Sequence, residues 1–267
     1  ISSIGKSTKS TWSYYKSGVT TLSSEAKLWW KLRKNPKVNS TWREHKLRQR
    51  LPVDILRMLP IVANPVPPPF GLSVPLIASS FPRRFLTRQF WSHDQQIEFH
   101  ECEYKLRWSK PLIELFETYG AQSYTEAKSL IMSREDQAAC ELCSLSRRHL
   151  LALSRSWLRR GLIRGLLPLN LISSRRLRGL LLEKAGILHA EYRMLRREDL
   201  NTLEEHELWY ACFELGLRVD GISPQVALRS YLNLLETEGE GDPPSSLLLH
   251  APFLLQWETL VEECSID

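Results

Sequence analysis

The chain has 267 residues, of which 43% are hydrophobic and 25% are charged, a balance typical of a globular protein with enough apolar material for a core. Its five cysteines are odd in number and unevenly spaced, which argues against a secreted disulfide framework and favours a reducing compartment. The formal net charge of +6 is sorted into blocks: residues 147–197 carry thirteen cations against two carboxylates, or +11, whereas residues 198–267 carry two cations against fifteen carboxylates, or −13. One surface of the protein should therefore attract polyanions.

The first 50 residues form a basic N-terminal region (1–50). It holds twelve Lys and Arg, only two carboxylates and many hydroxyl side chains. This composition is typical of a mitochondrial transit region, or of a segment that lies on an anionic membrane. A solvated basic tail fits the same composition equally well. Because the chain begins with Ile1 rather than Met, we also expect that it has been processed or trimmed.

An apolar, Pro-rich segment follows (51–82). No charged residue occurs from Met58 to Pro82, yet this run contains seven prolines. Proline breaks the interior of a helix, so we expect a broken or re-entrant membrane segment here rather than a straight spanning helix. An extended apolar linker that packs on the domain surface is the alternative. Basic residues flank both sides of the run, so charge bias does not set an orientation.

The rest of the chain has the periodicity of helices. The first of them is predicted to start at Ser92, with Gln95 completing a capping box, and to bend at Pro111. A second helix is predicted over residues 124–143, opened by Thr125. No convincing alternating strand appears in this part of the chain. The pattern therefore predicts an all-α fold.

Two arginine-rich helices come next. The third helix is predicted to begin near Arg147 and to end at Pro168, and a short fourth helix is predicted from Ser173 or Ser174 to Gly186. Apolar residues line one arc of the third helix, and its arginines fall on the opposite side. Arginine pairs bidentately with phosphate and releases counterions, so these helices predict a polyanion-binding surface. Its candidate residues are Arg148, Arg155, Arg159, Arg160, Arg164, Arg175, Arg176 and Arg178.

Two other interpretations of these arginines remain open. The acidic segment 198–267 could neutralise them within the molecule. Contact with an anionic lipid, such as cardiolipin, is the second alternative.

The acidic C-terminal part also has helical periodicity and clear boundary signals. These signals are a capping box at Thr202 and Glu205, a left-handed C-terminal glycine at Gly216, an N-cap followed by proline at Ser223-Pro224, and a last helix from Ser245 or Ser246 to Glu262 with a kink at Pro252.

Catalytic motifs are absent from the sequence. It contains no GxSxG, HExxH or P-loop, and no GxGxxG followed by a helix, and its seven histidines are scattered. Cys140 and Cys143 form a CxxC without a second pair of ligands, so two small residues inside a helix are the favoured interpretation. We therefore predict no enzyme activity, no metal site and no cofactor.

Several blocks of sequence resemble the LETM domain family, the leucine-zipper and EF-hand transmembrane proteins of mitochondria. The blocks are FPRRFLTRQFW (Phe81–Trp91), LSRRHLLALSRSWLRRG (Leu145–Gly161), the run Leu200–Glu236 and SLLLHAPFLL (Ser246–Leu255), in the family's order. The similarity is greatest to the branch of the family that lacks EF-hands. It covers roughly residues 40–260. No DxDxDG pattern occurs, so calcium binding is not carried over.

The resemblance implies a mitochondrial membrane anchor followed by an all-helical domain in the matrix, with the inner membrane as the expected location. The fold it implies is an antiparallel multi-helix bundle similar to 14-3-3, over residues 83–262. The function it implies is a non-enzymatic adaptor that binds the mitochondrial ribosome, through RNA or protein, and supports respiratory-chain biogenesis and mitochondrial structure. The partner's identity, the topology, the choice of inner or outer membrane and the oligomeric state are left open by the sequence.

Two further functions compete with the adaptor. Longer relatives in the family are linked to cation/proton exchange, which implies a transport component. The run from Leu200 to Leu235 also resembles the helix–loop–helix of SAP-type DNA-binding modules, which implies a nucleic-acid-binding regulator. The second helix of that element offers only Arg229 for phosphate contact.

Overall fold

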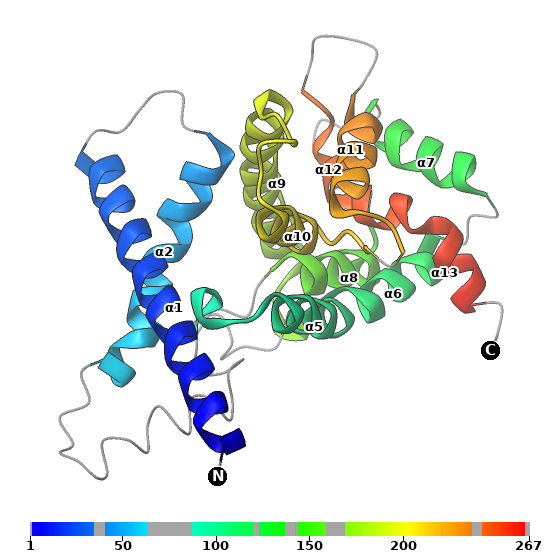
Figure 1. Ribbon diagram of the computed structural model, residues 1–267. Helices are drawn as coiled ribbons and strands as arrows, with labels where there is room; N and C mark the ends of the chain where they lie inside the picture. The colour runs from blue at the N-terminus through cyan, green and yellow to red at the C-terminus, as the bar shows by residue number, and fades with distance from the viewer. Residues whose placement is uncertain are drawn as a thin grey trace. The chain divides into compact units, whose positions relative to one another are not determined.

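The structure is a computed structural model that describes residues 2–34, 41–62, 87–119, 123–136, 142, 144–158, 169–219, 221–236 and 242–264. Every regular element in these ranges is helical, which confirms the predicted all-α class (Figure 1). The chain divides into two compact units, residues 1–99 and 100–267, and each is considered by itself. The similarity to the 14-3-3 arrangement stays a prediction.

The first unit contains a helical hairpin. The long α1 (Ser2–Lys34) packs against α2 (Trp42–Val62), with Leu32, Leu47 and Leu51 buried between them. Thus most of the basic region 1–50 is helical. None of the helices within the described ranges is long and apolar enough to cross a bilayer. Residues 63–86, which include most of the predicted membrane segment 51–82, lie outside those ranges.

The helix after the apolar run begins where the sequence predicts. In α5 (His93–Tyr104) the Ser92 hydroxyl accepts from the Gln95 amide at 3.2 Å, and the Gln95 side chain accepts from the Ser92 amide at 3.1 Å. This is the reciprocal capping box. It satisfies two N–H groups that the first turn of a helix leaves unpaired.

A π-helical turn, Lys105–Ser109, joins α5 to α6 (Lys110–Tyr119). It ends two residues before Pro111, where the sequence predicts a bend. Proline has no N–H to donate to the carbonyl four residues earlier and its ring crowds that carbonyl, so a wider turn relieves the clash. The turn also directs Trp108 into the core, where its ring meets Trp157 edge-on at 4.8 Å.

The next helix, α7 (Tyr124–Asp136), starts at the predicted residue but has a different cap. The hydroxyl of Ser123, not that of Thr125, accepts from the amide of Glu126 at 3.2 Å. The predicted extension of this helix to residue 143 is wrong, because Leu142 lies in a turn with a left-handed φ of +65°. The other residues of the extension, including Cys140 and Cys143, lie outside the described residues. Within the described part of the chain, no three His, Cys, Asp or Glu side chains are grouped to hold a metal.

The two arginine-rich helices are α8 (Arg147–Trp157) and α9 (Ser174–Arg197), capped by the hydroxyls of Ser146 and Ser173. The predicted end of α9 at Gly186 is wrong. Gly186 faces open space, and the buried stripe continues beyond it through Leu188, so the packing carries the helix on. The predicted end of the third helix at Pro168 is also wrong, because α8 ends at Trp157 and the backbone of Leu158 is extended. Residues 159–168 lie outside the described ranges.

The acidic part folds into α10 (Glu205–Glu214) and α11 (Pro224–Leu235). The capping box of α10 is formed by Glu204 and Glu207, not by the predicted pair Thr202 and Glu205. The Thr202 hydroxyl is engaged instead in the preceding turn, where it donates to the carbonyl of Asp199 at 2.7 Å. The predicted cap of α11 at Ser223 is confirmed.

The predicted last helix is divided into α12 (Ser245–Leu255) and α13 (Trp257–Cys264). The break falls at Gln256, four residues after Pro252. The Gln256 backbone amide bonds the carbonyl of Phe253, and its side-chain amide donates to the carbonyls of Pro252 at 2.8 Å and Gly216 at 2.7 Å. The side chain thus ties the break to the end of α10.

Gly216 ends α10 in the left-handed conformation, with φ +70°, as the sequence predicts. The Leu217 amide donates back to the Cys212 carbonyl at 2.8 Å, which completes a Schellman-type end. A Cβ atom at position 216 would lie 2.7 Å from the Trp108 ring. Both the backbone conformation and the packing therefore require glycine here.

We expect Gly216→Ala to lower the free energy of unfolding by about 2 kcal/mol or more, because it adds left-handed strain to a clash with a buried ring. The matched control is Gly186→Ala, in open space on a helix, which should raise the free energy of unfolding by about 0.5–1 kcal/mol. Urea unfolding of both variants measures the two changes. Equal effects of the two substitutions would contradict the assigned role of Gly216.

Cysteine reactivity reports on the same region. Cys212 is fully buried on α10, and its burial raises the pKa of the thiol well above the ordinary value, whereas Cys102 is exposed. The thiolate is the nucleophile, so we expect iodoacetamide at pH 8 to modify Cys102 readily and Cys212 only after unfolding. Peptide mass spectrometry with and without urea measures both rates. Comparable rates in the folded protein would contradict this packing.

Candidate polyanion-binding site

The N-terminal turns of α8 and α9 lie next to each other in the second unit. Arg147, in the first turn of α8, donates to the Asn170 carbonyl at 2.7 Å and to the Ser174 hydroxyl at 3.4 Å. At the other end of α8, the Trp157 ring lies under the ammonium of Lys184, 5.4 Å from the ring centroid. The start of α8 thus contacts the start of α9, and the end of α8 contacts a residue further along α9, so the two helices run in the same direction. Their two N-termini therefore meet at one end of the bundle, which we call the basic end.

Helix polarity and side-chain charge have the same sign at the basic end. A helix N-terminus carries a partial positive charge and unpaired N–H groups, and both caps here are uncharged serines. Neither first turn contains an acidic residue; Arg147 and Arg148 open α8, and Arg175 and Arg176 open α9. Each cation so placed opposes the helix dipole by about 0.3–1 kcal/mol. The arrangement costs stability and favours the binding of an anion.

Two of the predicted site residues pair with the protein's own glutamates. Arg148 lies 2.7 Å from Glu117, and Arg155 pairs with Glu114; both carboxylates belong to α6. The Arg148 and Glu117 side chains are 66% and 52% exposed, and such pairs contribute at most about 1 kcal/mol. A competing phosphate therefore meets only a weak internal competitor at this position.

The remaining predicted residues differ in their surroundings. Arg178 is half-buried and donates to the carbonyls of Leu142 at 3.2 Å and Leu145 at 3.5 Å, which anchors the segment before α8. Arg175 and Arg176 are exposed, and no carboxylate in the described part of the chain pairs with them. The other three predicted residues, Arg159, Arg160 and Arg164, lie outside the described ranges. The full site of eight arginines thus stays a prediction.

The acidic segment neutralises the other end of α9. Arg193 pairs with Asp242 at 3.3 Å, and Arg196 lies 3.9 Å from Glu236. Within the described ranges, the carboxylate that pairs at the basic end is Glu117, the partner of Arg148, and it belongs to α6 instead. The sequence left open the alternative that residues 198–267 neutralise the arginines within the molecule. In the structure, this neutralisation occurs at the C-terminal turns of α9.

Sequence reasoning missed Arg147. This residue directly follows the cap Ser146 and is exposed, but it does not share the helical face on which the other arginines were aligned. Its guanidinium bonds a backbone carbonyl and a hydroxyl, both neutral, so its charge is retained. The available signal was its position at the start of a helix.

The SAP-like element offers less to a phosphate chain. Its one cation on the second helix, Arg229 of α11, is exposed and donates to the Asn201 side chain at 3.3 Å. A single arginine supplies one phosphate contact.

A family model described as LETM1-like, RBD matches this chain over residues 41–138 and again over 108–254, and the second range alone is more than half of the chain. The chain belongs to this family. No curated protein and no solved structure matches it. In this LETM1-like chain, the second matched range contains the whole of α8 and α9 and hence the basic end.

The helix-dipole argument predicts opposite stability changes at the two ends of α9. Arg175→Glu with Arg176→Glu should raise the free energy of unfolding by about 1 kcal/mol, because it puts acids in the first turn and creates an S-x-x-E capping box with Ser173. The matched control is Arg197→Glu, an exposed charge reversal in the last turn, which should lower it. Thermal or urea unfolding decides; changes of the same sign at both ends would contradict the argument.

Proposed function

We propose that the protein is a non-enzymatic, membrane-tethered mitochondrial adaptor whose LETM-type helical domain binds the mitochondrial ribosome. Its role would be to support the biogenesis of respiratory-chain proteins and mitochondrial structure. Membership of the LETM1-like, RBD family supports ribosome binding, since RBD stands here for a ribosome-binding domain. The observation that carries the proposal is the basic end, where two helix N-termini and the exposed Arg175 and Arg176 meet.

The chemistry of the basic end suits RNA phosphate. Arginine presents two parallel N–H donors to phosphate oxygens, and helix N-termini add backbone donors. Arg147, Arg175 and Arg176 supply this charge on adjacent first turns, with Arg178 anchoring the segment beside them. Such contacts bind without sequence specificity and release counterions. The full interface in this proposal also includes Arg148 and Arg155, whose glutamate partners would exchange for phosphate, and Arg159, Arg160 and Arg164.

The membrane tether in the proposal rests on the sequence. Residues 58–82 carry no charge and follow a basic region that is typical of mitochondrial proteins or of contact with anionic lipid. In this arrangement the tether lies in the inner membrane, with the helical domain in the matrix. Contact of the basic residues with cardiolipin would hold the same orientation.

Binding to purified mitochondrial ribosomes should depend on the basic end and on salt. We expect the double variant Arg175→Glu, Arg176→Glu to bind at least about tenfold more weakly at 150 mM salt, with a shallower dependence of log affinity on log salt concentration. Co-sedimentation over a salt series measures both quantities. Arg197→Glu on the same helix and Arg229→Glu on α11 are controls that should bind nearly as the unaltered protein does.

The outcome that contradicts the proposal is unchanged sedimentation of the double variant. Because this variant is expected to be more stable, weaker binding would not arise from unfolding. If binding is retained but vesicles containing cardiolipin bind only the unaltered protein, the basic end serves the membrane instead.

A further inference from the structure

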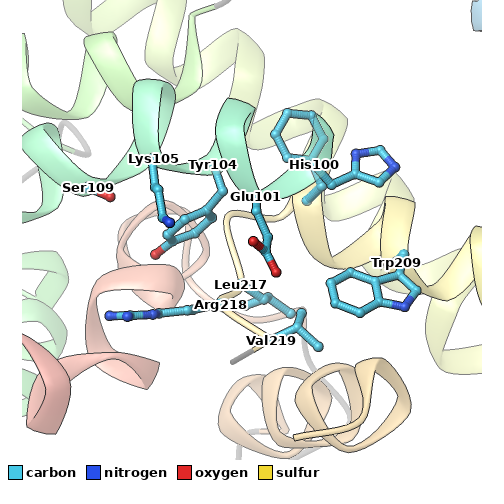
Figure 2. A pocket seen from close by; sticks show the side chains of 10 residues that line it. His100, Glu101, Tyr104, Lys105, Ser109, Trp209, Leu217, Arg218 and Val219 are labelled. Atoms are coloured by element: carbon cyan, nitrogen blue, oxygen red, sulfur yellow. The ribbon is translucent and has the colours of Figure 1, made fainter. Parts of the chain in front are cut away.

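The exposed side of α1 carries charge of a single sign. At 100° per residue, three lysines share an arc of about 120° with two apolar side chains, and the other side chains of residues 17–34 in this arc are hydroxyls. We call these five residues the lysine face: Val19, Lys27, Trp30, Lys31 and Lys34. The pocket of about 280 Å³ in the second unit (Figure 2) differs, because Glu101, Lys105 and Arg218 line it together and its charge favours no single class of ligand.

The one carboxylate of α1 lies on a different side of the helix. Glu25 is half-buried, and it accepts from the Gln89 side chain at 2.8 Å. No carboxylate in the described part of the chain pairs with Lys27, Lys31 or Lys34. The Lys34 ammonium lies over the Trp30 ring instead, 5.5 Å from the ring centroid. The charge of the lysine face is therefore available to an external anion.

The lysine face also exposes apolar surface. Trp30 and Val19 are each 56% exposed, whereas the side chains that pack α1 against α2, among them Leu22, Trp29 and Leu32, lie on the opposite side of the helix. The hairpin core therefore does not require Trp30. Tryptophan is enriched where a membrane meets water, and a neighbouring lysine keeps its ammonium at the phosphates while its methylene groups cover apolar surface. A tryptophan among lysines suits a lipid surface.

Both ends of the uncharged run 58–82 are attached to the same hairpin. The run begins within α2, just after Leu56, which is 68% exposed. Beyond the run, the Gln89 side chain donates to Asp54 of α2 at 3.4 Å as well as to Glu25 of α1. The chain thus leaves the hairpin and returns to it. Any apolar phase that takes up the uncharged run is therefore brought next to the hairpin.

We propose that the lysine face lies on an anionic phospholipid surface. In this arrangement the Trp30 ring lies at the level of the headgroups, and the three lysines contact lipid phosphates. Each lysine near such a surface contributes about a fivefold factor in affinity. The inference rests on the membrane tether of the proposed function and adds the surface by which the first unit contacts the bilayer. The arginines of the basic end take no part in it.

Flotation of the whole chain with phosphatidylcholine vesicles, with and without cardiolipin, tests the inference. We expect the unaltered protein to bind the cardiolipin vesicles about tenfold or more tightly than the neutral ones. The triple variant Lys27→Gln, Lys31→Gln, Lys34→Gln should lose most of this preference. Trp30→Ala should weaken binding to the cardiolipin vesicles about fivefold. The matched control is Leu28→Ala, an exposed apolar residue of α1 outside the lysine face, which should bind nearly as the unaltered protein does.

The double variant Arg175→Glu, Arg176→Glu is the charge control, and it should keep the preference for cardiolipin. The triple lysine variant should still sediment with ribosomes and should bind polyuridine as the unaltered protein does. All substituted side chains of α1 are exposed, so the hairpin should fold as before, which far-UV circular dichroism checks.

An unchanged preference for cardiolipin in the triple lysine variant overturns the inference. So does a loss of polyuridine binding in that variant larger than its loss of vesicle binding, because the lysine face would then serve RNA. Either result leaves the proposed ribosome contact and the membrane tether standing. If the unaltered protein binds neither kind of vesicle, the tether fails together with the inference.

Discussion

The burial of α12 is the constraint on which the second unit depends. Ten of its eleven residues are buried, and it packs against α7, α9 and α11. Its polar groups need partners inside the core. His250 donates from Nδ1 to the Ser246 carbonyl at 2.7 Å, which leaves its Nε2 to accept from His149 Nε2 at 2.8 Å, and the Trp157 indole donates to the Leu249 carbonyl at 2.8 Å. Both His149 and Trp157 belong to α8.

These bonds explain how the apolar helix α12 determines the position of α8 and hence of the basic end. A hydrophobic contact alone tolerates small shifts, but two hydrogen bonds in a dry core fix the register of α8 on α12. At the first residue of α12, Ser245 lies 3.3 Å from the His189 ring of α9. Both arginine-rich helices are thereby attached to one buried element. The meeting of their N-terminal turns follows from the core, although every arginine at the basic end lies outside it.

The sequence predicted those boundaries that rest on local chemistry. Ser92 with Gln95, Gly216 and Ser223 each act within a few residues of their own position, and each is confirmed. The caps of α7 and α10 were each assigned two residues away from their true positions, because several neighbouring side chains there can accept from the first turn. The end of α9 was missed because packing decided it. A glycine such as Gly186 costs a helix only about 1 kcal/mol, and the burial of the apolar residues that follow it in α9 outweighs that cost.

The candidate site was predictable only in part for a related reason. Composition located the arginine-rich segment, and periodicity placed Arg148 and Arg155 on one face of a helix. It could not show that glutamates of α6 reach that face, because Glu114 and Glu117 lie some thirty to forty residues away in the chain. Nor could it bring the first turn of α9 beside that of α8, which depends on α12.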